Sequence, residues 1–165
     1  IGGFIHEKGR GCILVVNKWD LIEKDSQTMV QFEKKIYSDL KYLSYAPILF
    51  ISALTGQRVP KILNIVDHVA EQAKKRIPTA PLNRSFSQWV GRFTPPLYKN
   101  RIVKLNYINQ ISTAPPTFVI YTNTPEGIHF SYERYLINQI RETFSFEGVS
   151  IRLQFRKKRK ERKDE

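Results

Sequence analysis

Two short apolar runs, each followed by a polar loop and then a helical pattern, constrain the fold of this chain more than any other feature. The runs are residues 12–16 and residues 48–51. Continuous runs of this length are typical of strands buried on both faces of a parallel sheet. Apolar spacing predicts a helix over residues 28–43 and another over residues 59–76. The order strand, helix, strand, helix predicts an α/β fold with a parallel sheet.

The start of the first helix has several candidate caps. Thr28 and Gln31 have the spacing of a capping box, and Asp25 or Ser26 could cap the helix instead.

The composition is that of a basic globular protein. The 165 residues carry 27 Lys and Arg against 15 Asp and Glu, a formal net charge of +12, which favours a polyanionic partner. A single cysteine, Cys12, excludes an internal disulfide and a cysteine cage for zinc. No stretch approaches the ~18 apolar residues of a membrane span, and no signal-peptide pattern opens the chain. We expect a cytoplasmic protein, monomeric and with no membrane partner.

The positive charge is concentrated in the second half of the chain. Residues 1–80 hold 12 basic and 8 acidic side chains, and residues 81–165 hold 15 and 7. The last ten residues, 156–165, hold 7 basic and 3 acidic side chains without apolar periodicity. We therefore expect a basic disordered tail over 156–165.

Polar residues follow both predicted strands at the point where each strand ends. Asn17, Lys18 and Asp20 follow the first apolar run, and Ser52 and Ala53 follow the second. Because the carboxyl ends of parallel strands meet at one edge of a sheet, where ligands bind, we expect these residues to share one site.

The residue types at this site fit a guanine base. The Asp20 carboxylate can accept both donors of the guanine edge, whereas adenine would present a lone pair to it. The Ala53 backbone N–H can donate to the guanine carbonyl, the Lys18 stem can lie along the base, and the Asn17 amide can bridge the loops. A purely structural alternative makes Asp20 a helix cap and Ser52 a turn former.

The second half of the chain predicts a separate α+β domain. Its elements follow the order α-β-β-α-β: a helix over 82–93, strands over 102–107 and 118–121, a helix capped by Ser131, and a strand over 151–155. This order resembles the K-homology (KH) fold, which grips single-stranded nucleic acid with a GXXG loop. No GXXG occurs in residues 81–155.

Without that loop, nucleic-acid binding must use the basic surface. The spacing of most aromatic residues favours core packing over base stacking. Each basic residue alone also fits a solvated surface, but their density favours phosphate binding. The candidates are Lys99, Arg101, Lys104, Arg152, Arg156, Lys157, Lys158, Arg159 and Lys160.

The motif Asn17-Lys18-Trp19-Asp20 with Ser52-Ala53-Leu54 resembles the guanine-specificity half of a Ras-like P-loop GTPase domain. The phosphate-binding loop GxxxxGK[ST] does not occur in residues 1–165, and no switch segment matches. We therefore expect the chain alone to bind guanine nucleotides weakly and to hydrolyse no GTP.

A Ras-like half-domain followed by a KH-like domain without GXXG is similar to the Der, or EngA, family of ribosome-assembly GTPases. Further residues that carry the resemblance are 45–50, 115–119, 129–136, 146–148 and 151–152. The resemblance implies domains at 1–78 and 79–155 and guanine recognition by Asn17, Lys18, Asp20, Ser52 and Ala53. It also implies GTP or GDP as cofactor, Mg²⁺ held by residues outside this chain, and docking on the rRNA of the large ribosomal subunit.

Two other hypotheses remain open. The chain could be a nucleic-acid-binding module whose first half is only scaffold, with no nucleotide role. An Era-like GTPase would share the guanine chemistry but should contain GXXG.

Overall fold

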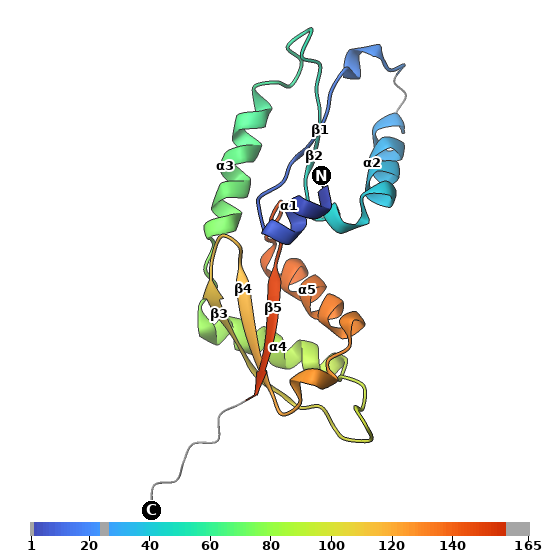
Figure 1. The fold of residues 1–165 in the computed structure, drawn as a ribbon. Coiled ribbons are helices and arrows are strands. Elements are labelled where there is room, and N and C mark those ends of the chain that lie inside the picture. The colour runs from blue at the N-terminus through green and yellow to red at the C-terminus, as the bar shows by residue number, and fades with distance from the viewer. Residues whose placement is uncertain (1, 24–26, 158–165) are drawn as a thin grey trace, which may run out of the picture. The chain divides into compact units, whose positions relative to one another are not determined.

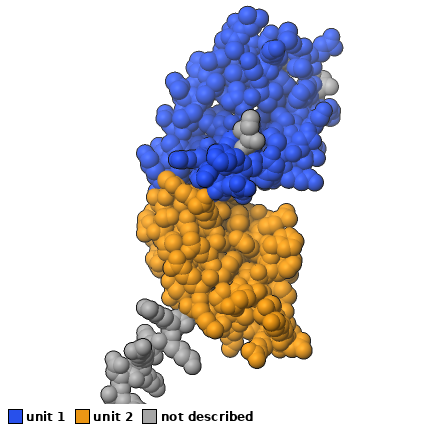
Figure 2. Space-filling view, viewed as in Figure 1, with its two compact units in different colours: residues 1–75, 146–150 blue, residues 76–145, 151–165 orange. Residues whose placement is uncertain are grey.

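The computed structural model describes residues 2–23 and 27–157 (Figure 1). The chain divides into two compact units, coloured separately in Figure 2. Unit 1 comprises residues 1–75 and 146–150, and unit 2 comprises residues 76–145 and 151–165. The α/β pattern of the first half and the α+β pattern of the second are both confirmed.

Unit 1 contains the predicted parallel strands and helices. Strand β1 (Leu14–Val16) pairs with β2 (Ile48–Phe50) in parallel. The pairing continues past both strands, because the Ile51 N–H donates to the Val16 carbonyl (2.8 Å) and the Trp19 N–H to the Ile51 carbonyl (2.9 Å). Three helices complete the unit: α1 (Gly2–Lys8), α2 (Thr28–Asp39) and α3 (Lys61–Lys74).

A segment from far along the chain completes unit 1. Residues 146–150 belong to it, although their neighbours in sequence belong to unit 2. The Gly148 carbonyl accepts from the Cys12 N–H (2.8 Å), and the Gly148 N–H donates to the Tyr45 carbonyl (2.7 Å). The Phe146 N–H donates to Gln72 Oε1 at 3.0 Å. The bond to Cys12 extends the backbone pairing of unit 1 beside β1, and the other two connect this segment to Tyr45 and to α3.

Unit 2 has the predicted order α-β-β-α-β. Its elements are α4 (Thr79–Arg92), β3 (Leu105–Ser112), β4 (Thr117–Thr122), α5 (Phe130–Phe144) and β5 (Arg152–Lys157). The strand order is β3-β4-β5, with β3 antiparallel and β5 parallel to β4. Figure 1 shows α4 crossing behind the three strands.

Strand boundaries in unit 2 differ from the prediction, and β3 runs on to Ser112 instead of ending at residue 107. The first strand begins at Leu105 rather than at residue 102, because the Asn123 side chain accepts from the Lys104 N–H (2.8 Å) and donates to the Ile102 carbonyl (2.9 Å). These backbone groups are thereby satisfied without a regular strand. The last strand runs on to Lys157, so Arg156 and Lys157 are part of the sheet rather than of a tail.

Two predicted helix caps are wrong. Helix α2 contains Thr28 as its first residue, and Gln27 stands at the cap position without a side-chain cap bond. Asp25 and Ser26, the alternative caps, lie outside the described residues. Helix α5 begins at Phe130, two residues earlier than a Ser131 cap allows, and His129 caps it by accepting from the Ser131 N–H.

The core of unit 2 lies between the helices and one face of the sheet. Pairing places Ile108, Phe118 and Ile120 on this face, where all three are fully buried. The helices contribute the buried residues Leu82, Phe86, Trp89, Tyr132, Leu136 and Ile140. The predicted packing role of the helix aromatics is therefore confirmed, and the opposite sheet face remains for other contacts.

Candidate guanine-recognition loops and nucleic-acid surfaces

The first loop of the candidate guanine site is held in place by a buried tryptophan. Lys18 adopts a left-handed conformation (φ 62°, ψ 33°), and the 3₁₀ turn η1 (Trp19–Leu21) follows. Trp19 is 3% exposed and packs against the rings of Phe50 (4.3 Å between centroids) and Phe32 (5.3 Å). This anchoring fixes the backbone of the neighbouring half-buried Asp20.

The Asn17 side chain joins the two polar loops. Its Oδ1 accepts from the Lys18 N–H (2.7 Å) and from the Ala53 N–H (3.0 Å). Ser52 is fully buried and shapes the second loop, because its Oγ accepts from the Thr55 N–H (3.2 Å). All five residues that the sequence assigns to guanine recognition therefore lie on two loops that contact each other.

One group of the two loops is free to bind guanine, and another is already engaged in a hydrogen bond within the protein. Within the described chain, the Asp20 carboxylate has no hydrogen-bond or ion-pair partner, so both oxygens are available to the two donors of guanine. The Ala53 N–H already donates to Asn17 Oδ1. A guanine carbonyl that takes this N–H, as the sequence analysis expects, has to compete with Asn17.

The open face of the unit 2 sheet combines aromatic and basic side chains. The Tyr107 and Tyr121 rings stack across β3 and β4, with centroids 4.4 Å apart and planes 20° apart. Exposed Arg152 and Arg156 alternate along β5, and Arg156 donates to Gln154 Oε1 (2.8 Å). Stacked rings beside guanidinium groups on a sheet face suit unpaired bases and phosphates.

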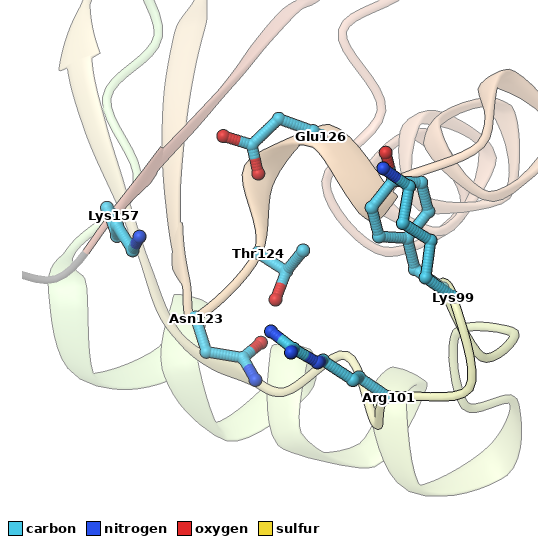
Figure 3. A pocket seen from close by; sticks show the side chains of 7 residues that line it. Lys99, Arg101, Asn123, Thr124, Glu126 and Lys157 are labelled. Carbon is cyan, nitrogen blue, oxygen red and sulfur yellow. The ribbon is translucent and has the colours of Figure 1, made fainter.

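Three other basic candidates meet at a pocket in unit 2. The pocket has a volume of about 550 Å³, and Figure 3 shows the side chains that line it. Lys104 is exposed but is not part of the lining, and Lys158, Arg159 and Lys160 lie outside the described residues. The lining residues are Tyr98, Lys99, Arg101, Asn123, Thr124, Glu126 and Lys157.

A tight turn of the backbone places Lys99 and Arg101 at this pocket. Tyr98 and Arg101 exchange two backbone hydrogen bonds, of 3.0 and 2.9 Å. The two residues between them, Lys99 and Asn100, both have positive φ (48° and 58°), which is the pattern of a type I′ turn. The turn therefore presents Lys99 and Arg101 on a tight, defined backbone.

The remaining lining residues were missed by sequence reasoning. Thr124 and Glu126 lie just beyond β4, and Glu126 is in the 3₁₀ turn η3 (Pro125–Gly127). Asn100 was a signal for the turn, because asparagine tolerates positive φ better than most residues. Nothing in the spacing of residues 98–101, 123–126 and 157 shows that they meet.

The described residues contain neither a membrane-spanning helix nor a metal cluster. Within residues 2–23 and 27–157, no helix is long and apolar enough to cross a membrane. The same part of the chain holds no cluster of three or more His, Cys, Asp or Glu side chains arranged for a metal ion.

The comparisons with known proteins agree on one family. Residues 76–156 match the family model described as the KH-domain-like domain of EngA bacterial GTPase enzymes, C-terminal. The whole chain is similar to proteins named GTPase Der: 54% identical over 98% of the chain in Desulfitobacterium hafniense, and 52% identical over 96% in Desulforamulus reducens. The relative from Geotalea daltonii is 53% identical over 94% of the chain.

The match covers only part of those relatives. The chain spans 37% of the Desulfitobacterium protein, 36% of the Desulforamulus protein and 35% of the Geotalea protein. The KH-like family model matches the elements of unit 2 and also residues 146–150, which belong to unit 1. Nearly the whole chain is therefore similar to part of the GTPases named Der, and residues 76–156 match the C-terminal KH-like domain of EngA GTPases.

Proposed function

We propose that unit 1 recognises the guanine base of GTP and GDP through Asn17, Lys18, Asp20, Ser52 and Ala53. One observation carries this proposal: the Asn17 amide ties both loops together beside the Asp20 carboxylate, which has no partner among the described residues. The Asp20 carboxylate, whose backbone is fixed by the packing of Trp19, can distinguish guanine from adenine because only guanine offers two adjacent donors. The similarity to GTPases named Der supports the same reading.

Phosphate binding and hydrolysis require residues that this sequence does not contain. Residues 1–165 include no GxxxxGK[ST] loop, which in GTPases cradles the phosphates and supplies a magnesium ligand. We assign Mg²⁺ and the hydrolysis of GTP to a longer protein that contains this sequence. The 165-residue chain alone should bind guanine nucleotides weakly and release no phosphate from GTP.

The base preference of Asp20→Asn tests this proposal. In a longer protein that carries this sequence and a phosphate-binding loop, the variant should lose affinity for GTP and gain affinity for xanthosine triphosphate. The reason is that the asparagine amide presents a donor to the second carbonyl of xanthine. Asp39→Asn, an exposed change of equal charge at the end of α2, is the control. An unchanged base preference in Asp20→Asn would favour unit 1 as a scaffold.

We further propose that unit 2 docks the protein on rRNA of the large ribosomal subunit during its assembly in the cytoplasm. The KH-like family match, the excess of basic residues after residue 80 and the tyrosine and arginine side chains of the open sheet face support this role. Because there is no GXXG loop, the basic surface itself supplies the phosphate contacts.

Salt dependence tests the docking role. Binding of the 165-residue chain to rRNA fragments should weaken steeply between 50 and 200 mM salt, since each phosphate contact releases counterions. A chain that ends at residue 157 keeps β5 and loses the basic residues beyond it, so the slope of log affinity against log salt should decrease. Salt-independent binding, or no binding, would contradict the docking role.

A further inference from the structure

We propose that the pocket of unit 2 binds one ribonucleotide of an RNA strand. Its phosphate would contact Lys99, Arg101 and Lys157, and a ribose hydroxyl would donate to Glu126. This inference rests on the proposed RNA docking and names a site for it. Because the sugar-phosphate unit is the same for every base, the pocket would select RNA over DNA without reading its sequence.

The backbone around the pocket is held in place by hydrogen bonds within the protein. The type I′ turn from Tyr98 to Arg101 forms one wall. Asn123 uses both ends of its amide on the backbone of Ile102 and Lys104, which fixes that turn against the end of β4. Such preorganisation lowers the entropic cost of binding.

A glycine sets the opposite wall. Gly127 is buried in η3, and a Cβ on it would lie 2.8 Å from Tyr98 Cβ and 3.0 Å from Val103 Cγ2. The close approach that this glycine permits holds η3, and therefore Glu126, beside the Tyr98 turn. The walls of the pocket thus come from segments that are packed and hydrogen-bonded, not from free loops.

The charges in the pocket favour an anion. Lys99, Arg101 and Lys157 bring three positive charges to the lining and Glu126 brings one negative charge. Among these described side chains, no ion pair joins Glu126 to a cation. The cations are therefore available to a phosphate, and Arg101 offers the planar fork that matches phosphate oxygens.

The carboxylate defines the ligand further. A carboxylate beside a phosphate site repels the phosphate, so its presence favours a ligand that also donates a hydrogen bond. Figure 3 shows the Glu126 carboxylate on the side of the pocket opposite Arg101. In a ribonucleotide the 2′-hydroxyl is a donor close to the phosphate, and it is absent from DNA.

The volume of the pocket and the covered face of its Tyr98 ring both fit a sugar-phosphate unit rather than a base. A volume of about 550 Å³ lies within the range of small-ligand sites, roughly 300–1,000 Å³. Lys99 Nζ lies 5.3 Å from the centroid of the Tyr98 ring and occupies one of its faces. We therefore assign base stacking to the Tyr107 and Tyr121 pair of the open sheet face, and sugar-phosphate binding to the pocket.

Fluorescence anisotropy with two labelled oligonucleotides tests the proposal. Oligo-rU and oligo-dU of equal length differ only in the 2′-hydroxyl, and the 165-residue chain should bind the ribose form more tightly. Arg101→Ala and Lys157→Ala should each weaken oligo-rU binding and reduce the salt slope by about one. Arg84→Ala, which removes an exposed charge of α4 outside the pocket, is the matched control and should leave binding unchanged.

The Glu126→Ala variant separates ribose binding from simple anion binding. Removal of the carboxylate should improve oligo-dU binding and reduce the ratio of rU to dU affinity toward one. An equal improvement for both oligonucleotides would overturn the role of the ribose hydroxyl. Circular dichroism identifies any variant that fails to fold; if Arg101→Ala disturbs its turn, Lys157→Ala at the end of β5 decides the result.

Failure of the pocket is distinguishable from failure of the docking role. If the wild-type chain binds rRNA but Arg101→Ala and Lys157→Ala bind oligo-rU as well as it does, the pocket proposal is overturned and docking stands. If the wild-type chain binds no RNA, both proposals are overturned.

Discussion

At the residue scale, the buried Tyr132 makes the stability of unit 2 depend on pH. This tyrosine is 1% exposed, and its hydroxyl donates to the Phe93 carbonyl at 2.7 Å. Burial raises the pKa of Tyr132 far above its ordinary value of 10.0, and the charge on Tyr135 adds to the effect. The unfolded chain therefore loses this proton at lower pH than the folded chain does.

The first prediction concerns Tyr132→Phe. Above pH 10 the wild-type free energy of unfolding should fall, because the unfolded state ionises while the folded state stays protonated; one such group accounts for about 1.4 kcal/mol per pH unit. The variant should lose that part of the slope. At neutral pH it should be about 1 kcal/mol less stable, since the hydrogen bond to Phe93 is gone. Urea unfolding followed from pH 7 to pH 11 measures both effects.

Tyr107→Phe provides the control for this experiment. Tyr107 is 38% exposed, so loss of its hydroxyl should change the stability at neutral pH little. An alkaline slope that is the same in Tyr132→Phe and in the wild type would contradict the assignment to Tyr132.

At the scale of elements, one asparagine joins α4 to the edge of the sheet. Asn83 Nδ2 donates to the Ile108 carbonyl (2.9 Å), and Asn83 Oδ1 accepts from the Ile108 N–H (3.0 Å). Both backbone groups point away from β4, on the edge of β3 where no strand of the described residues pairs with them. The side chain thus takes the place of a missing neighbouring strand.

Asn83→Ala should therefore destabilise unit 2. The substitution leaves one N–H and one carbonyl of β3 without their partner, at a cost of about 1–3 kcal/mol. Ser87→Ala, an exposed change one turn further along α4, should cost less than about 0.5 kcal/mol. Chemical denaturation measures the free energies, and hydrogen exchange at Ile108 should accelerate in Asn83→Ala alone. Equal stability of the two variants would show that the bridge contributes nothing.

Element order was predictable from the sequence, and element boundaries were not. Periodicity reports burial directly, so the α/β half and the α-β-β-α-β half could both be read from apolar spacing. The start of β3 depends on Asn123, a side chain about twenty residues away that binds the backbone before Leu105. Contacts over such sequence distances leave no local pattern.

The same distinction holds for the sites. The candidate guanine loops were accessible to sequence reasoning because each motif is short and follows a recognisable strand, and the Asn17 bridge joins the two loops. The pocket depends on three separate segments and on positive φ at Lys99 and Asn100. Only the basic character of some of its residues was visible.

At the scale of the whole molecule, the chain passes between the two units more than once. It leaves unit 1 after residue 75, returns for residues 146–150 and then enters β5 of unit 2. Within unit 1, Gly148 takes part in backbone bonds to Cys12 and Tyr45. We therefore predict that the stability of unit 1 depends on these five residues, which are synthesised after most of unit 2.

Gly148→Ala tests this dependence. Gly148 has φ 73°, and a Cβ on it would lie 2.4 Å from Val69 Cγ2 and 3.2 Å from the Cys12 carbonyl oxygen. Backbone strain and overpacking together should lower the stability of unit 1 by about 2–4 kcal/mol. Hydrogen exchange should accelerate in β1 and α3, while the amides of β4 keep their protection.

Gly91→Ala is the matched control, because a Cβ on Gly91 in α4 meets nothing within 4 Å. Alanine is the better helix former, so this variant should be unchanged or up to about 1 kcal/mol more stable. If Gly148→Ala exchanged its unit 1 amides as slowly as Gly91→Ala, residues 146–150 would be a covering loop on unit 1. Faster exchange in Gly148→Ala alone would make them a necessary part of unit 1.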